Sequence, residues 1–328
     1  MSTASQTTPA NLVVRDLRVA YRSTGGGAIL AADGVSLSLR SGEVLGLVGE
    51  SGCGKTTVAR AITGLVTPEQ GEIELDGARL ARRSRAQRRA IQLVFQDPFA
   101  SLNPRRTVRS VLAELLKVHA LADGAQRERR CVELMELVGL PAGALDRLPA
   151  AFSGGQRQRI AIARAIAVQP RLIVADEPMS ALDVSVGAAI LALFERLRSD
   201  LGLGLLLISH NLAVVAAICD HVAVMYLGRV VETGPRGDVF ADPRHPYTRA
   251  LLDAAPRLRR DRAEGPRLRE EAPPPGTRPS GCAFHDRCPR AEEICRRDAP
   301  VLAAVQGQPG RLAACHFSHE QHRGGRPR

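Results

Sequence analysis

The chain has 328 residues, 45% of them apolar, and a formal net charge of +11. This length and apolar content suffice to bury a full core, so we expect a globular protein. Basic residues are interleaved with Asp and Glu, and aromatic residues make up only 3% of the chain with no Trp, which argues against a protein that stacks single-stranded bases.

No segment has the pattern of a secretion signal or of a lone membrane span. Residues 1–12 are polar, and the most apolar stretch, 201–227, is interrupted by polar side chains such as Ser209, His210 and Asp220. A lone span needs roughly 20 predominantly apolar residues. We therefore expect a soluble cytoplasmic chain, whose seven cysteines are thiols or metal ligands and not a disulfide framework.

The apolar pattern predicts an α/β protein. Residues 11–47 contain short alternating runs typical of strands, and 71–96 return to that pattern. Residues 105–168 have mostly helical periodicity. The runs RLIVAD and LGLLLIS are typical of buried parallel strands, with a helix over 186–201 between them. After residue 256, Arg, Glu and Pro dominate, which indicates a linker before a cysteine-bearing tail.

A phosphate-loop motif follows the third predicted strand. Residues 49–56, GESGCGKT, match G-x-x-x-x-G-K-[ST] between an apolar strand and a helix. The glycines let successive backbone N–H groups converge on phosphate oxygens at the helix N-terminus. Lys55, one of two lysines in the chain, supplies a point charge for the β- and γ-phosphates, and Thr56 offers a hydroxyl to Mg²⁺. The plainer alternative is a Gly-rich turn that binds nothing.

Two carboxylates close the strand RLIVADEP. Asp176 and Glu177 should emerge at the carboxyl end of a buried parallel strand, where α/β sheets bind their ligands. Asp176 fits a carboxylate associated with Mg²⁺, and Glu177 fits a base that polarises the attacking water. A pair of solvated acids at a strand end is the alternative.

A second candidate anion site lies in FSGGQRQRIAIARAIA. Ser153 can cap the helix, while the two glycines after it expose backbone N–H groups at the positive end. A well-capped helix without a ligand would have the same sequence, so the neighbouring motifs must decide.

Together these motifs resemble those of the ATP-binding-cassette (ABC) ATPases. The signature motif of that family is written here as FSGGQ, with Phe152 where Leu is common. Further family elements follow in the expected order, namely Tyr21, Gln96 in VFQDP, Asp183 in SALD, and His210 after LGLLLIS. The resemblance covers about residues 12–240.

This resemblance implies a P-loop NTPase fold, with a RecA-like core, an antiparallel β subdomain and a helical subdomain. It places the ATP-binding domain at 11–255, with the helical subdomain at about 100–168. Residues 256–328 then form the linker and a small C-terminal extension.

The resemblance also implies a role for each site residue. The catalytic residues are Glu177 as base, His210 on the γ-phosphate, Gln96 and Lys55. Mg²⁺ is assigned to Thr56, Gln96 and Asp176. The residues assigned to ATP are Tyr21, Gly49, Ser51, Gly52, Cys53, Gly54, Lys55, Thr56, Thr57, Gln96 and Asp176, with Ser153, Gly155 and Gln156 on the ATP of a second cassette.

Two short strings resemble the oligopeptide/dipeptide branch of this family. These are QDPFASLNPR at 96–105 and HPYT at 245–248, and the departures from the branch pattern are Met179, Gly187 and Asn211. The branch implies an ATPase subunit that energises import of di- or oligopeptides, with nickel or glutathione as alternative solutes. The implied partners are a second ATPase subunit, identical or a sister, two permease subunits and an extracytoplasmic substrate-binding protein. The implied location is peripheral, on the cytoplasmic face of the inner membrane.

The tail contains four cysteines, Cys282, Cys288, Cys295 and Cys315, separated by five, six and nineteen residues. Zinc ribbons use tighter pairs, so zinc is the weaker alternative. Four thiolates suit a [4Fe–4S] cluster, and the tail of the peptide-transport branch is similar to this spacing. Here His285 or His316 could replace one ligand, and four reduced thiols are the remaining alternative.

A soluble ABC ATPase that acts on nucleic acid is the competing function, motivated by the net charge and the cysteines. The Arg-rich segment 79–89 is its main local support, but a solvated helix face or hairpin explains that segment better. We therefore expect no specific nucleic-acid partner. A small-molecule kinase shares the phosphate loop but explains neither the signature motif nor His210.

Overall fold

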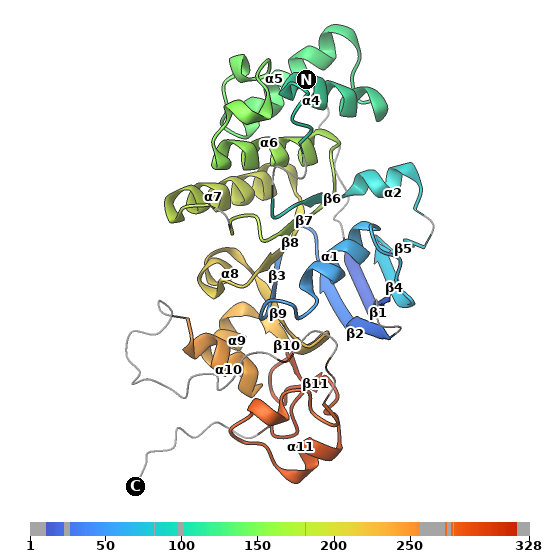
Figure 1. Ribbon diagram of the computed structural model, residues 1–328, viewed down its shortest axis with the longest axis vertical. Coiled ribbons are helices and arrows are strands. Elements are labelled where there is room, and N and C mark those ends of the chain that lie inside the picture. Colours follow the sequence, from blue (N-terminus) through green and yellow to red (C-terminus); the bar gives the residue numbers. More distant parts are fainter. Residues whose placement is uncertain are drawn as a thin grey trace.

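The computed structural model describes residues 11–22, 27–81, 83–97, 102–180, 182–255, 273, 277 and 279–319. These residues form two β-sheets, a group of helices at one end and a cysteine-bearing tail at the other (Figure 1). Most of the predicted linker after residue 256, and residues 98–101 of the 96–105 string, lie outside the described residues.

The larger sheet has eight strands in the order β11-β12-β10-β9-β3-β8-β7-β6. Its parallel strands are β3 (Val44–Val48), β6 (Ile91–Val94), β7 (Leu172–Asp176), β8 (Gly204–Ser209) and β9 (His221–Tyr226). Every residue of β3, β7 and β8 is buried, as expected for parallel strands that are covered on both faces. The carboxyl ends of these strands therefore meet at one edge of the sheet.

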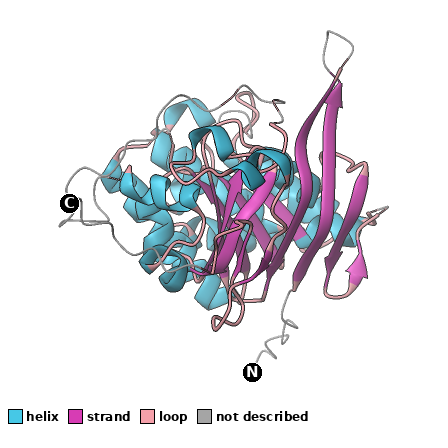
Figure 2. Ribbon diagram, turned by 90° about the horizontal axis from the view of Figure 1, so that it is seen from below, coloured by secondary structure: helices cyan, strands magenta, loops and turns pink. Residues whose placement is uncertain are grey.

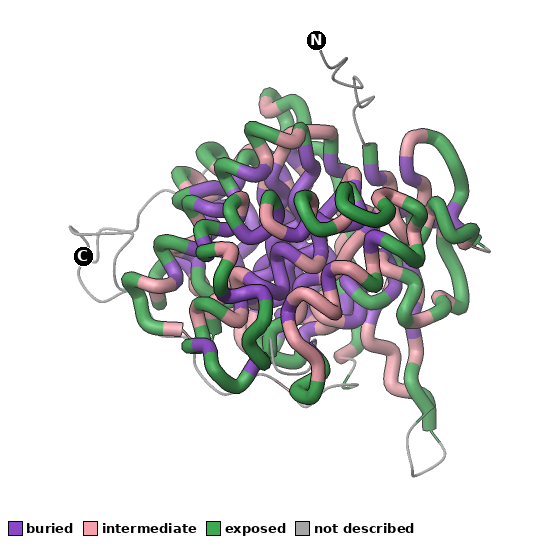
Figure 3. Tube along the Cα trace, turned by 90° about the horizontal axis from the view of Figure 1, so that it is seen from above, coloured by how far each residue is buried: buried purple, intermediate pink, exposed green. Residues whose placement is uncertain are grey.

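Alternate residues of β3 contribute to two separate apolar cores. Val44 and Val48 belong to the core shared with the helical group, whereas Leu45 and Leu47 belong to the core shared with the smaller sheet. This division follows from the two-residue period of a strand. Figure 3 shows the buried positions gathered at the centre of the molecule.

The smaller sheet is antiparallel and has the order β2-β1-β4-β5. Its strands are β1 (Leu12–Arg22), β2 (Ala28–Leu39), β4 (Gln70–Leu75) and β5 (Ala78–Arg79). The helix α1 (Lys55–Thr63) contacts β1 and β2 on one side and β6 and β7 on the other. The helix thus lies between the two sheets, and Figure 2 shows the long strands of the smaller sheet standing apart from most helices.

Helices α4 (Val108–Val118), α5 (Gly124–Leu137) and α6 (Gly154–Ala167) contact one another and form the helical group, with α7 (Val184–Leu201) against α6. Two short 3₁₀ turns, η1 (Ala142–Ala144) and η2 (Pro149–Ala151), connect α5 to α6. The Arg-rich segment around residue 85 contains α2 (Arg85–Ala90), which buries none of its residues.

The remaining helices before the tail are short. They are α8 (Leu212–Ile218), α9 (Arg236–Ala241) and α10 (Pro246–Asp253). Among the described helices, none combines the length and the apolar character needed to cross a bilayer.

The cysteine-bearing tail is continuous with the larger sheet. It consists of η3 (His285–Arg287), α11 (Glu293–Arg297), β11 (Ala303–Ala304) and β12 (Leu312–Ala313). Strand β12 pairs with β10 (Arg229–Pro235) in antiparallel register. Beside this pairing, Arg311 Nη2 lies 2.7 Å from Glu232 Oε1, and both side chains are almost fully buried. The same Glu232 carboxylate accepts the backbone N–H groups of Arg244 and His245.

Candidate nucleotide site

The predicted phosphate loop connects the end of β3 to the start of α1. Gly54 adopts a φ of +104° immediately before the helix, and a Cβ atom there would lie 2.0 Å from the carbonyl oxygen of Ala31. Only glycine fits at such a close approach of backbone to backbone. The chain therefore turns sharply into α1, whose first backbone N–H groups have no partner within the helix and are available to an anion.

The Lys55 side chain is held inside the loop. Its Nζ donates to the carbonyl oxygens of Gly49 and Glu50, both at 2.8 Å, and approaches Cys53 Sγ at 3.7 Å. The side chain of Cys53 is also buried, and this burial raises the pKa of its thiol. The Lys55 ammonium group is thus bound by backbone oxygens of the loop itself.

The other loop residues surround this centre. Ser51 and Gly52 are exposed, whereas Thr57 is buried in the first turn of α1. Tyr21, at the end of β1, is 36% exposed and its Oη donates to Thr57 Oγ1 at 3.4 Å. A partly exposed aromatic ring therefore stands next to the start of α1.

Thr56 and Asp176 meet directly. The Thr56 hydroxyl donates to Asp176 Oδ1 at 3.2 Å, across 120 residues of sequence. Burial raises the pKa of the Asp176 carboxyl, and the hydrogen bond from Thr56 opposes that rise. Two hard oxygen ligands are thus adjacent at the carboxyl end of β7, and such ligands suit Mg²⁺.

Two of the predicted catalytic residues, His210 and Gln96, contact the carboxylate of a third, Glu177. Glu177 Oε1 lies 3.1 Å from His210 Nδ1, and Glu177 Oε2 accepts from Gln96 Nε2 at 3.4 Å. Each residue follows a different parallel strand, β7, β8 or β6. Because these strands are neighbours in the sheet, their carboxyl ends bring the three side chains to one place.

The signature residues form the N-terminus of α6. Ser153 Oγ accepts from the Gln156 N–H at 3.3 Å, and Gln156 Oε1 accepts from the Ser153 N–H at 3.0 Å, which is a complete capping box. A Cβ atom on Gly155 would lie 2.4 Å from Val186 Cγ1, so glycine lets α6 and α7 approach closely. Ser153, Gly154 and Gln156 are exposed, and this positive helix end therefore faces outward.

Two residues near the phosphate loop were not predicted from the sequence. Tyr247 Oη accepts from the backbone N–H of Glu50 at 2.8 Å, and Arg287 forms a bidentate ion pair with the Glu50 carboxylate. Tyr247 belongs to the string HPYT, which served only as a marker of the branch. No local pattern distinguishes Arg287 from the many other arginines of the chain.

The four tail cysteines line one small cavity of about 10 Å³, together with His245, His285 and His316. Burial raises the pKa of the Cys282 thiol to about 11 and also raises the pKa values of Cys288 and Cys315. None of the seven cysteines, all of which lie in the described residues, forms a disulfide. In the described part of the chain, however, no three His, Cys, Asp or Glu side chains are arranged as a ready metal site.

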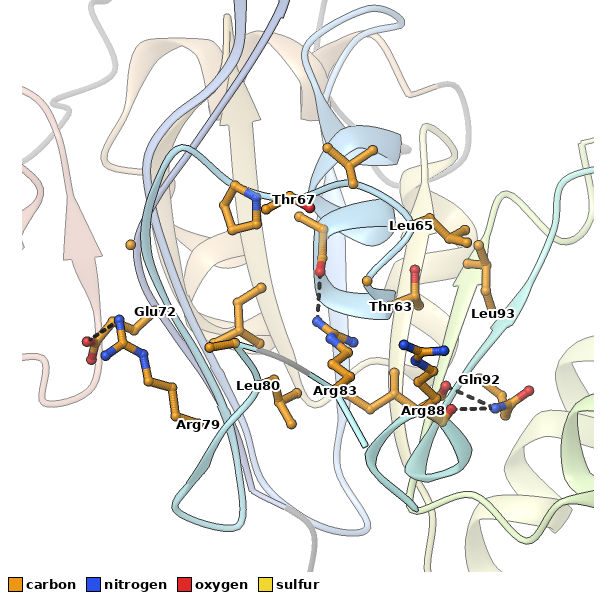
Figure 4. A pocket seen from close by; sticks show the side chains of 18 of the residues that line it. Thr63, Leu65, Thr67, Glu72, Arg79, Leu80, Arg83, Arg88, Gln92 and Leu93 are labelled. Carbon is orange, nitrogen blue, oxygen red and sulfur yellow. Dashed lines mark hydrogen bonds and ion pairs between the residues drawn. The ribbon is translucent and has the colours of Figure 1, made fainter. Parts of the chain in front are cut away.

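A much larger cavity, about 1070 Å³, lies at the opposite end of α1 (Figure 4). Arg83 donates there to the carbonyl oxygens of Ala61 and Ile62, and so caps the C-terminal turn of the helix. Burial lowers the pKa of Arg83 to about 10. This cavity is thus separate from the phosphate loop, which opens at the N-terminus of the same helix.

Two family models match the chain. Residues 32–180 match the model described as ABC transporter, and residues 231–295 match the oligopeptide/dipeptide transporter C-terminal region. A protein of Brucella abortus (strain 2308), named as a candidate peptide import ATP-binding protein, is 49% identical over 313 residues, which cover 93% of this chain and 92% of that protein. A protein of Brucella ovis with the same description is 48% identical over 309 residues, covering 93% of this chain and 96% of that protein.

Solved structures with a similar fold have lower identity. An ATP-binding cassette solved as a dimer in a post-hydrolysis state, bound to ADP and Pi, aligns with a TM-score of 0.62 and 29% identity over 69% of this chain and 98% of that chain. A protein from Clostridium perfringens, described as part of an ABC transporter complex, aligns with a TM-score of 0.62 and 28% identity over 70% of this chain and 90% of that chain.

Proposed function

Because this chain belongs to the ATP-binding proteins of ABC transporters, in the branch with the oligopeptide/dipeptide C-terminal region, we propose that it energises the import of peptides across a membrane. The chain is an ATPase of the cassette fold. The observation that carries the proposed mechanism is the convergence of Glu177, His210 and Gln96 beside the phosphate loop.

In the proposed reaction a water molecule attacks the γ-phosphorus of ATP while the Glu177 carboxylate accepts a proton from that water. The bond between the γ-phosphorus and the bridging oxygen breaks, and ADP and phosphate leave. His210 contacts the γ-phosphate and, at 3.1 Å from Glu177, also orients the base. Lys55 leaves the carbonyl oxygens of Gly49 and Glu50 for the β- and γ-phosphates.

Mg²⁺ would be held by Thr56, Asp176 and Gln96, and it would neutralise the charge of the phosphates. The 3.2 Å contact between the Thr56 hydroxyl and the Asp176 carboxylate supports this assignment, because oxygen ligands at one point suit that ion. Gln96 also contacts Glu177, so it links the base to the segment that follows β6. In the proposal this segment passes the state of the site on to the permease.

The nucleotide site would be completed by a second cassette in head-to-tail contact. The outward-facing start of α6 supports this arrangement, because its N–H groups and positive dipole can receive the phosphates bound by another subunit. Ser153, Gly155 and Gln156 would make that contact. A similar cassette was solved as a dimer.

We further propose two permease subunits and an extracytoplasmic substrate-binding protein as partners, with this chain peripheral on the cytoplasmic face of the inner membrane. Residues 11–255 would be the ATP-binding domain, including the helical part at about 100–168, and residues 256–328 the linker and extension. Peptides are the favoured solute because the similar Brucella proteins are described as peptide import proteins. Nickel or glutathione import, and a soluble ATPase on nucleic acid, are not favoured.

The change Glu177→Gln tests the catalytic assignment. It keeps the shape of the side chain but removes the proton acceptor, so ATP hydrolysis by the assembled transporter should fall by about a hundredfold or more. ATP binding to the full chain should stay within about twofold of the original value, since Glu177 contacts the water and not the nucleotide. Hydrolysis and nucleotide affinity are measured on the same preparations.

Glu195→Gln is the matched control, because Glu195 is an exposed residue of α7 and is not among the residues of the candidate site. It should leave hydrolysis unchanged. Cells whose sole copy carries Glu177→Gln should also lose uptake of labelled di- and oligopeptides. Normal ATP hydrolysis in that variant would refute the assignment of Glu177 as the base. Loss of nickel uptake alone would change the assigned solute from peptides to nickel.

For the tail we propose a [4Fe–4S] cluster held by Cys282, Cys288, Cys295 and Cys315. The support is that four thiols line one cavity, and sulfur ligands in this number suit such a cluster. A cavity of about 10 Å³ holds about one water, so the cysteine loops would have to separate as a cluster enters. A bound cluster would keep the cysteines as thiolates.

Anaerobic purification of the full chain tests this assignment. We expect bound iron and sulfide with broad visible absorption, and we expect Cys295→Ser to lose both, whereas Cys131→Ala in the helical group keeps them. Bound zinc in place of iron would change the assigned metal. Cysteines without any bound metal would refute the proposed cluster site.

A further inference from the structure

Glu50, the second residue of the phosphate loop, is held at each of its polar groups. Its backbone N–H donates to Tyr247 Oη at 2.8 Å, and its carbonyl oxygen accepts from Lys55 Nζ at 2.8 Å. Its carboxylate receives two parallel hydrogen bonds from Arg287, from Nη1 to Oε2 at 2.8 Å and from Nη2 to Oε1 at 2.9 Å. The loop is therefore fixed from outside at this residue, by α10 and by the tail.

Arg287 is built to stay in one position. Its side chain is 4% exposed, and that of Glu50 is 21% exposed. The guanidinium also donates from Nη1 to Tyr226 Oη at 3.3 Å, and it lies 5.8 Å from the ring centroids of both Tyr226 and Phe284. A planar, bidentate pair in a dry setting fixes both distance and orientation, which a single hydrogen bond from lysine cannot do.

The segment that presents Arg287 belongs to the cysteine-bearing tail. Arg287 ends η3, which lies between Cys282 and Cys288. The turn is closed by the His285 N–H donating to the Cys282 carbonyl oxygen at 3.0 Å and by the Arg287 N–H donating to the Phe284 carbonyl oxygen at 3.1 Å. A movement of this cysteine loop would therefore also move the arginine.

The position of Glu50 matters for ATP because Glu50 is part of the loop that would receive the phosphates, and before ATP binds its carbonyl oxygen holds the Lys55 ammonium group. A loop that shifts at Glu50 changes both where the ammonium group rests and where the loop N–H groups point. Binding to a loop that is already in place avoids the cost of ordering it, and that cost would otherwise reduce affinity.

We infer that Arg287 is a positioning residue for the phosphate loop: by holding Glu50 it keeps the loop in the conformation that receives ATP, so the C-terminal tail is part of the nucleotide site. The inference rests on the proposed ATP site but goes beyond it. The same contact makes the tail a determinant of ATP affinity and not of the chemical step, since Arg287 touches no reacting atom.

A double-mutant cycle on the full chain tests the contact. Affinity for ATP with Mg²⁺ is measured for the original protein, Arg287→Met, Glu50→Gln and the double variant. We expect each single change to weaken ATP binding by about tenfold, with the double variant close to either single one, because both remove the same interaction. Arg287→Lys should lie between the original and Arg287→Met.

The kinetic readout separates positioning from general damage. In the assembled transporter Arg287→Met should raise the KM for ATP by about tenfold, while kcat at saturating ATP changes by less than about twofold. Arg297→Met is the matched control, because Arg297 lies in the same tail but its exposed side chain pairs with its neighbour Asp298. It should leave KM unchanged.

Additive losses in the cycle, or an unchanged KM in Arg287→Met, would overturn the inference. If Arg287→Met fails to fold, Glu50→Gln alone still tests the contact, since the tail then keeps its arginine. If only the inference is wrong, the original protein still binds and hydrolyses ATP. If the proposed function is wrong, the original protein does neither.

Discussion

Gly54 allows the shape of the phosphate loop because it has no side chain. Gly54 has no side chain at a point where a Cβ atom would meet a backbone oxygen of β2 at 2.0 Å. A backbone atom cannot rotate away as a side chain can, so either the loop or the strand must shift. Glycine is thus required at position 54 for two reasons, the close approach of β2 and the φ of +104°.

We expect Gly54→Ala to weaken ATP binding by at least about tenfold, since a loop displaced by even about 1 Å loses its aligned N–H groups. Gly77→Ala is the comparison. Gly77 also has a positive φ, +75°, but nothing lies within 4 Å of its added Cβ, so only the local backbone cost applies. Equal ATP affinities in the two variants, measured by calorimetry, would contradict this account.

Glu177 is a second residue whose backbone is unusual. Its φ of +46° lies in the left-handed region, which is rare for residues with a side chain and costs on the order of 1–3 kcal/mol. The backbone N–H is fixed to the Ile208 carbonyl oxygen at 3.0 Å, across the β7–β8 pair. This turn aims the carboxylate at His210 and Gln96, which follow the neighbouring strands β8 and β6.

At the scale of elements, the helices α2 and α6 begin with the same device and differ in position. Both have a complete capping box, Ser84 with Gln87 in α2 and Ser153 with Gln156 in α6. Ser84 lines the large cavity at the C-terminal end of α1, whereas Ser153 faces outward from the helical group. This pair allows the structural and functional roles of a capping serine to be separated.

Ser84→Ala and Ser153→Ala should each destabilise the chain by about 1 kcal/mol, because each removes one side-chain cap. Only Ser153→Ala should also lower ATP hydrolysis by the transporter, since in the proposed pair of cassettes Ser153 contacts the partner's nucleotide. Thermal unfolding and hydrolysis are measured for both variants. Similar loss of hydrolysis in both would reduce the role of Ser153 to capping.

At the scale of the whole molecule, elements that have a local sequence pattern could be predicted, whereas contacts between segments distant in the sequence could not. The buried strands β3, β7 and β8 are continuous apolar runs, and the phosphate loop has a spacing dictated by its ligand, so both are evident in the sequence. The pairing of β12 with β10 was not expected, because two-residue strands leave no periodic pattern.

The contacts of Glu50 illustrate the same limit within the site. Tyr247 and Arg287 lie 197 and 237 residues away along the chain. No spacing rule connects residues so far apart, and an arginine in an arginine-rich tail carries no distinguishing signal. Only the fold, by placing the tail against the end of β9 and α10, brings them to the loop.

The contact between Glu50 and Arg287 has a consequence for the order in which the protein matures. A ribosome makes the phosphate loop early, and 237 further residues separate Glu50 from the arginine that fixes it. A chain that ends before Arg287 lacks the ion pair that holds Glu50. From the inferred role of Arg287 we therefore expect tight nucleotide binding only after the cysteine-bearing segment has been translated and has packed against the cassette.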